Sequence, residues 1–182
     1  MNFEIRGSEV QLQHLNVRTE THGDEEVTAI DLKLRWDTGN EVLAQFHPAL
    51  RQRLYSLPPA EQEPVPGLDP EPVVLTFPEL APLHWHGEVK GCTLALHHAL
   101  GEGADIVIGK ATADGFTIEA LQGGTVRIGL RVKALCEDER ALGRLPLLLH
   151  RHVPMTLLRV RAQDEGDATE TLFAGDEEEQ EA

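Results

Sequence analysis

"TAIDLKLRW", residues Thr28 to Trp36, is the stretch that decides how this chain folds. Apolar and polar side chains alternate along it, which predicts a β-strand with one face in a core and the other in water. The apolar set is Ile30, Leu32, Leu34 and Trp36. The polar set is Asp31, Lys33 and Arg35.

A second stretch, "TVRIGLRVKA" from Thr125 to Ala134, repeats this alternation about 98 positions later. Each stretch leads through turn residues into apolar positions at helical spacing, interrupted by Pro48 in one case and Pro146 in the other. The similarity predicts an internal duplication of a β–β–α unit, over residues 8–55 and 105–154. Chance similarity between two antiparallel patterns remains the alternative. The expected fold class is α+β, rich in antiparallel sheet, with sheet inside and helices outside.

Six prolines between Leu57 and Val73 mark a boundary, because proline lacks a backbone donor and holds its φ fixed. We therefore expect a first β–β–α unit over residues 1–56, a proline-rich connector over 57–80, and a hairpin with the second unit over 81–163. Residues 1–163 are expected to form one compact domain. Residues 164–182 form an acidic tail that is expected to be disordered.

Length and composition point to a cytoplasmic protein. With 182 residues and 41% hydrophobic residues, the chain can bury a core without disulfides. No apolar run approaches the roughly 20 residues that cross a bilayer, and the first residues do not resemble a secretory signal. Cys92 and Cys136 are expected to be free thiols in a reducing compartment.

The net charge of −15 is unevenly distributed. Nine acidic residues and no basic one follow position 163, so residues 1–163 carry only −6. This balance disfavours duplex DNA binding, which needs clustered Lys and Arg. The tail is either a solubilising end or an interaction segment with an apolar anchor. In the second case its partner-binding residues are Leu172, Phe173, Asp176, Glu177 and Glu178.

"LHWHGEVKGCTLALHH", Leu83 to His98, gathers the metal-type side chains of the chain. It reads as a β-hairpin whose apolar face includes Cys92 and whose polar face is expected to carry His84, His86 and His97. Three imidazoles can hold zinc in an open site, yet no carboxylate follows at a recognisable second-shell spacing. A solvated face is the favoured interpretation, and no cofactor is expected.

Catalytic motifs are not evident in the sequence. "GEG" at residues 101–103 lacks the lysine and helix of a phosphate loop, and neither serine lies in a nucleophile elbow. The carboxylates that follow Cys136 would raise the pKa of its thiol, the wrong direction for a nucleophile. We therefore expect no enzymatic activity.

Basic residues occupy the outward positions of the two alternating stretches. These candidate nucleic-acid-binding residues are Lys33, Arg35, Arg127, Arg131 and Lys133. A cationic groove can bind single-stranded nucleic acid, although base stacking needs aromatic side chains and these make up only 4% of the chain. The alternative is a solvated sheet face whose long side chains cover apolar surface.

Two resemblances bear on function. An acidic tail beside a weakly basic groove is similar in layout to single-strand-binding proteins, in which the tail recruits partners, although the tail lacks their aromatic tip. Three segments resemble a family of uncharacterised phage- and prophage-encoded proteins: residues 16–34, 46–55 and 123–134. The second resemblance implies a host-cytoplasm protein from a replication gene cluster and transfers no site residue.

Three functions follow as hypotheses. The leading one is non-catalytic binding associated with phage nucleic-acid metabolism, through weak contacts to a single strand. The tail would then act as a partner or regulatory segment, with a host or phage replication protein as its target. The second is a phage accessory protein that binds a host protein through its acidic surface. The third is a small metal-dependent enzyme that uses the hairpin histidines.

Overall fold

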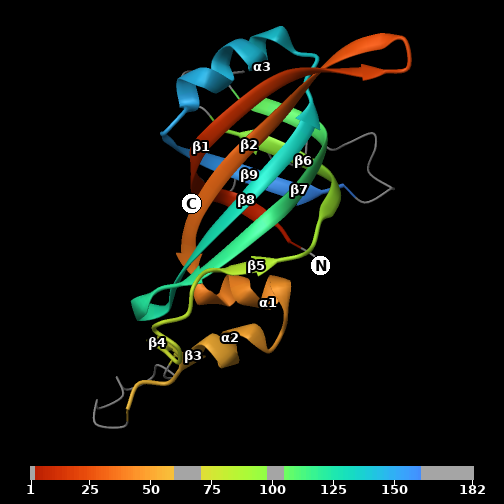
Figure 1. Ribbon diagram of the computed structural model, residues 1–182. Helices are drawn as coiled ribbons and strands as arrows, with labels where there is room; N and C mark the ends of the chain where they lie inside the picture. The colour runs from red at the N-terminus through yellow and green to blue at the C-terminus, as the bar shows by residue number, and fades with distance from the viewer. Residues whose placement is uncertain (1–2, 60–70, 98–104, 161–182) are drawn as a thin grey trace, which may run out of the picture.

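The computed structural model describes residues 3–59, 71–97 and 105–160. Six antiparallel strands form a closed barrel (Figure 1). They are β1 (Ile5–His22), β2 (Glu25–Gly39), β6 (Val89–Leu96), β7 (Ile106–Ala120), β8 (Thr125–Leu135) and β9 (His152–Arg159). Their order is β7-β6-β9-β1-β2-β8, and pairing of β8 with β7 completes the ring. The expected α+β class is therefore wrong, because strands dominate and helices form no layer.

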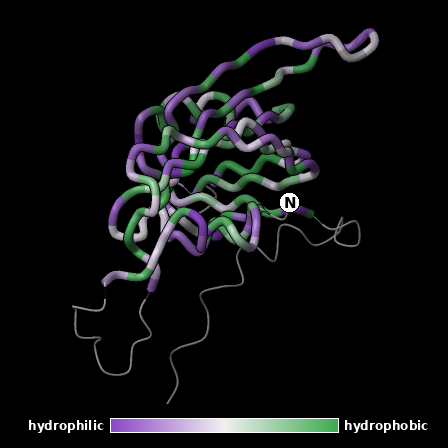
Figure 2. The backbone as a smooth tube through the Cα atoms, turned by 60° about the horizontal axis from the view of Figure 1, so that its bottom comes forward, coloured by the Kyte–Doolittle hydropathy of each residue, from purple (hydrophilic) through white to green (hydrophobic). Residues whose placement is uncertain are grey.

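Alternating side chains fill the barrel interior. On β2 the side chains of Ile30, Leu32 and Leu34 are almost completely buried, as predicted. The same holds for Val126, Ile128, Leu130 and Val132 on β8. Because β2 and β8 pair directly, with Leu32 opposite Val132 and Leu34 opposite Leu130, both apolar rows face the same interior. The polar rows of the two strands consequently share the outer wall, and hydropathy alternates along the chain (Figure 2).

Short helices lie at the two ends of the barrel (Figure 1). One end carries η1 (Asn40–Val42), α1 (Leu43–Phe46) and α2 (Leu50–Leu54), with the break at Pro48 that the sequence predicts. The other end carries α3 (Glu139–Arg144) and η3 (Leu145–Leu148), and the Asp138 side chain caps α3 by accepting from the Arg140 N–H. Helices outside a central sheet were expected. They instead bury Leu43 and Leu145 at opposite ends.

Each half of the chain has a third strand, after its helices, that the predicted β–β–α unit leaves out. β6 follows the first helical end and pairs with β7, while β9 follows the second helical end and pairs with β1. β6 and β9 also pair with each other, opposite the β2–β8 pair in the ring. The β–β–α description failed because the third strand of each half adds to the other half, an arrangement that only tertiary structure reveals.

The expected proline-rich connector is partly structured. β3 (Tyr55–Ser56) pairs with β4 (Val74–Leu75), and residues 60–70 lie outside the described residues. Buried Asn40 holds this segment in place, because its side-chain amide donates to the Pro72 carbonyl and its oxygen accepts from Arg51 Nε. A buried amide with both ends satisfied orients the segment specifically.

The predicted hairpin over residues 83–98 is wrong. β5 (Leu83–Trp85) pairs with the second half of β7, and β6 pairs with the first half. Leu83 and Trp85 therefore do not oppose Leu94 and Leu96. The error arises because a long neighbouring strand can accept two short strands end to end, which local alternation cannot distinguish from a hairpin.

Within the described ranges, no helix has both the length and the apolar character needed to cross a membrane.

Replacing Leu32 by Ala removes a fully buried side chain from the centre of the barrel. We expect the free energy of unfolding to fall by about 2–5 kcal/mol, from lost burial and the remaining cavity. Urea denaturation followed by circular dichroism measures this change. The matched variant Leu57→Ala, at a side chain that is 54% exposed, should change stability far less. Equal losses in the two variants would contradict the assignment of Leu32 to the core.

Candidate functional site

The five predicted cationic residues lie together on one outer wall of the barrel. Antiparallel pairing places Lys33 opposite Arg131, Asp31 opposite Lys133, and Asp37 opposite Arg127. Arg35 lies opposite Gly129 in the same ladder. Because successive side chains of a strand point to opposite faces of the sheet, all five basic side chains point away from the barrel interior, toward solvent. We call this surface, made by Lys33, Arg35, Arg127, Arg131 and Lys133, the cationic wall.

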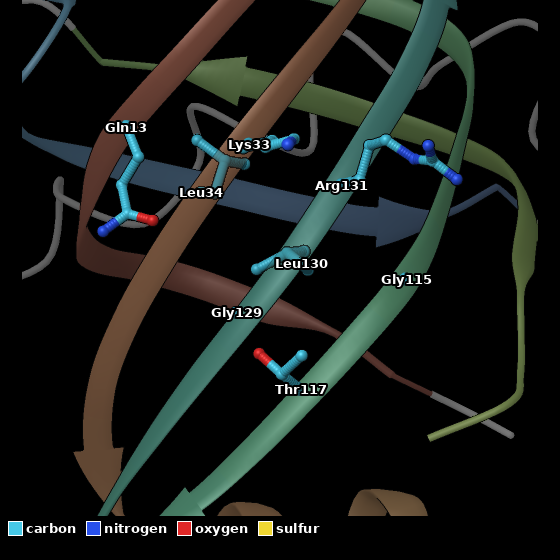
Figure 3. Close-up of a pocket in the computed structure, with 8 residues that line it drawn as sticks. All are labelled: Gln13, Lys33, Leu34, Gly115, Thr117, Gly129, Leu130 and Arg131. Atoms are coloured by element: carbon cyan, nitrogen blue, oxygen red, sulfur yellow. The ribbon is translucent and has the colours of Figure 1, made fainter. Parts of the chain in front are cut away.

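An open groove of about 360 Å³ crosses the cationic wall. It spans β1, β2, β8 and β7, and Lys33 and Arg131 stand beside it on adjacent strands (Figure 3). Its lining consists of Gln13, Lys33, Leu34, Gly115, Thr117, Gly129, Leu130 and Arg131. Gln13 adds an amide from β1, so the groove offers both cationic and neutral hydrogen-bonding groups to a ligand.

Two glycines form the floor of the groove. A Cβ on Gly129 would lie 2.4 Å from Thr117 Oγ1, so a larger residue cannot occupy this position without displacing Thr117. Gly115 has a φ of +61°, a conformation that side-chain-bearing residues rarely adopt. Thr117 leans toward Gly129 across the groove (Figure 3). The hollow therefore exists because glycine occurs on the outer face of two neighbouring strands.

Carboxylates pair with four of the five cations of the wall. Asp114 accepts from Arg131 Nε and from Lys133 Nζ, each at 2.7 Å. Asp37 accepts two bonds from Arg127, from Nε at 2.9 Å and from the terminal nitrogen at 3.0 Å. Arg35 Nε lies 3.9 Å from Asp37. The groups are partly exposed, so these pairs contribute modestly to stability and chiefly orient the side chains.

Lys33 differs from the other four cations. In the part of the chain that the structure describes, no carboxylate lies within ion-pair distance of its ammonium group. It stands beside the groove, exposed, on the strand next to Arg131. Lys33 is therefore the cation that can accept an external anion without first losing a partner.

The protonation states follow from the same contacts. The hydrogen bond from Arg127 lowers the pKa of Asp37, against the opposing effect of partial burial. For Asp114, burial acts to raise the pKa, but the hydrogen bonds from Arg131 and Lys133 together outweigh it and the pKa is lowered. Both carboxylates are thus ionised at neutral pH, so they offset two of the five positive charges of the wall.

The histidines considered for metal binding are separated. His84 lies on β5 and is exposed, as is His86, whereas His97 follows β6 on another part of the ring. Among the described residues, no group of three or more His, Cys, Asp or Glu side chains is arranged to hold a metal ion. Cys92 and Cys136 are buried, and burial raises the pKa of both thiols.

His97 belongs instead to a polar cluster on the outside of the barrel. Its Nδ1 lies 2.9 Å from Asp105 Oδ2, and its Nε2 lies 3.0 Å from Thr156 Oγ1. The Gly7 N–H donates to the same Thr156 oxygen at 3.2 Å. This cluster joins the ends of β6 and β7 to β9 and to the irregular pairing of β1 near Gly7. It satisfies a backbone donor where the β1–β9 register shifts.

The sequence predicted the cations and a groove along them, but not the other residues that line it. The missed lining residues are Gln13, Gly115, Thr117 and Gly129. One indication was present, because Gly129 interrupts an alternating strand and an internal glycine often marks a close approach of backbone. The proposed tail contacts at Leu172, Phe173, Asp176, Glu177 and Glu178 lie outside the described residues.

Comparison with protein-family models, with curated proteins and with solved structures finds no match for this chain. The resemblance to phage-encoded proteins therefore stays a prediction.

Replacing Thr156 by Val removes a hydroxyl and keeps the shape of the side chain. We expect the free energy of unfolding to fall by about 1–3 kcal/mol, because the Gly7 N–H and His97 Nε2 lose their shared partner. Chemical denaturation measures the loss. The same substitution at exposed Thr76 is the control and should have little effect. A Thr156→Val variant as stable as the unmodified chain would show that the cluster contributes nothing to holding the strands.

Proposed function

We propose that this protein is a non-catalytic binding protein that holds single-stranded nucleic acid against the cationic wall. The observation that supports the proposal is the groove itself, which brings Lys33, Arg131 and the amide of Gln13 to one hollow. A phosphate backbone is the anion that suits a row of cations along paired strands. At Gly115 an added Cβ would meet no atom closer than 3.7 Å, so a sugar or base can approach the backbone there.

Binding is expected to be weak and to depend on charge rather than on stacking. Phe3, Trp36, Phe46 and Phe116 are buried side chains, and Phe3, Phe46 and Phe116 pack against one another with ring centroids 4.9–5.6 Å apart. None of the groove-lining residues is aromatic. Since stacking supplies much of the affinity in single-strand-binding proteins, a wall without it relies on phosphate contacts.

The carboxylates of the wall set how many cations a nucleic acid can reach. Lys33 can contact a phosphate directly. Arg131 and Lys133 would have to divide their hydrogen bonds between Asp114 and a phosphate. In this proposal the tail after residue 163, with nine acidic residues, repels the same polyanion or recruits a basic protein partner. Both effects favour reversible binding.

Replacing Lys33 by Gln tests the role of the wall cation that has no carboxylate partner among the described residues. We expect weaker binding to a fluorescent oligothymidylate, measured by anisotropy at a series of salt concentrations. The slope of log K against log salt should become shallower by about 0.7, the contribution of one phosphate contact on a single strand. Lys90→Gln is the control for net charge, because Lys90 is exposed and lies on β6, whose ladders are with β7 and β9; unlike Lys33, it pairs with Glu88. Absence of salt-dependent binding in the unmodified chain would rule out the proposed function.

Replacing Asp114 by Asn should strengthen binding of the same oligonucleotide. The substitution removes the carboxylate shared by Arg131 and Lys133, so both cations become available to phosphate. Asp24→Asn makes the same change in net charge at the exposed turn of the β1–β2 hairpin and serves as the control. If the two variants gain affinity equally, the gain comes from overall charge and the wall has no special role.

A further inference from the structure

The β1–β2 hairpin projects beyond the closed barrel as an arm (Figures 1 and 2). β9 pairs with β1 only from Ile5 to Gln11, and β8 reaches β2 only as far as Ala29. β1 continues to His22, paired on one side with β2. In the described part of the chain, residues 13–22 therefore have no strand along the edge that faces away from β2.

This edge has little of the usual protection against pairing: its register shift lies between Leu12 and His14, at the base of the arm, and Arg18 and Glu20 are its charged residues. Exposed edge strands in natural proteins commonly carry Lys or Pro, or are covered by another segment. Residues 13–22 read "QHLNVRTETH", with neither Lys nor Pro, and Val17 on this edge is 49% exposed. A two-stranded ribbon is marginal by itself, whereas a sheet of four strands is stable.

The sequence of the edge is complementary to itself when two copies run antiparallel. With Thr19 on the two-fold axis, Arg18 of each copy lies opposite Glu20 of the other. Arg18 and Glu20 share one face, since they are two residues apart on a strand. Within one chain these side chains already form an ion pair, at 2.6 Å from the Arg18 terminal nitrogen, and Arg18 also pairs with Asp31. The dimer would therefore redistribute an existing pair between copies.

The other face of the edge is complementary as well. In the same register Thr19 lies opposite Thr19, and Val17 lies opposite Thr21. All of these are β-branched residues, which favour strands and pack well as cross-strand neighbours. One register thus brings opposite charges together on one face and β-branched side chains together on the other.

We propose that two copies of this chain associate through their arms, by antiparallel pairing of β1 with β1 centred on Thr19. The product is a four-stranded sheet in the order β2-β1-β1-β2. An isologous contact of this kind closes on itself and produces a dimer rather than a fibre. The contact lies beyond the barrel and leaves the groove open on each copy.

Charge reversal tests the register. Sedimentation velocity of the full chain over a range of concentrations should show a monomer–dimer equilibrium. Arg18→Glu alone, or Glu20→Arg alone, places like charges opposite each other twice per dimer, so association should weaken about tenfold or more. The double variant R18E/E20R restores both pairs and should recover association to within about threefold. Circular dichroism of each variant checks that the barrel is intact.

A cysteine at the axis gives a second test that does not depend on charge. Thr19→Cys should form a disulfide-linked dimer under mild oxidation, because opposed residues of an antiparallel pair have the Cα separation that a disulfide needs. Thr76→Cys, at an exposed position away from the arm, is the control. Cys92 and Cys136 are buried and should not react.

Several outcomes would overturn the proposal. A monomer at every concentration excludes the dimer, and so does a Thr19→Cys variant that crosslinks no faster than the Thr76→Cys variant. Failure of the double variant to recover association excludes the register. If charge reversal leaves the association unchanged but deletion of residues 164–182 abolishes it, the contact lies in the tail and not in the arm.

Discussion

The direct pairing of β2 with β8 is the constraint on which the rest of this structure depends. Its register sets Leu32 against Val132 and Leu34 against Leu130, so two strongly alternating strands share one interior. Shifting the register by one residue would turn every apolar side chain to solvent and place charges in the core. The register that buries the core thus also gathers the cations on one wall.

Closure of the barrel has a second consequence. Once β8 pairs with β7 and β6 pairs with β9, the described strands of the ring have partners on both sides over most of their length. A free strand edge remains in the arm, where β1 and β2 extend beyond the neighbouring strands β9 and β8. The polar side chains of the wall and the free edge of the arm therefore lie on different parts of the molecule. The wall offers side chains to a ligand, and the arm offers backbone hydrogen bonds to another strand.

The balance of charge on the wall decides what kind of binding it can support. Asp37 and Asp114 hold Arg127, Arg131 and Lys133 in fixed positions and reduce their attraction for distant anions. Under the proposed function, this weak attraction favours reversible binding of a nucleic acid. Lys33 then contributes more than its single charge suggests, because it is exposed beside the groove without a competing carboxylate in the described structure.

Local periodicity predicted those parts of the fold that depend on local sequence. The strand around Ile30, its partner around Ile128 and the helix break at Pro48 are all found in the structure. Barrel closure could not be predicted, because it depends on which distant strands become neighbours. The same limit explains the wrong hairpin, since β5 and β6 both pair with β7. For the site, alternation predicted the outward cations. The lining of the groove could not be predicted, because the approach of Thr117 to Gly129 depends on the register in which β7 and β8 pair.

The central claim is that the wall of β2 and β8 is the binding surface. Backbone amide chemical shifts, recorded by NMR while oligothymidylate is added at low salt, test it most directly. The account predicts that the largest shifts occur at Gln13, Lys33, Gly115, Gly129 and Arg131, with β6 and β9 little changed. Shifts concentrated on β6 and β9, or none at any oligonucleotide concentration, would contradict it.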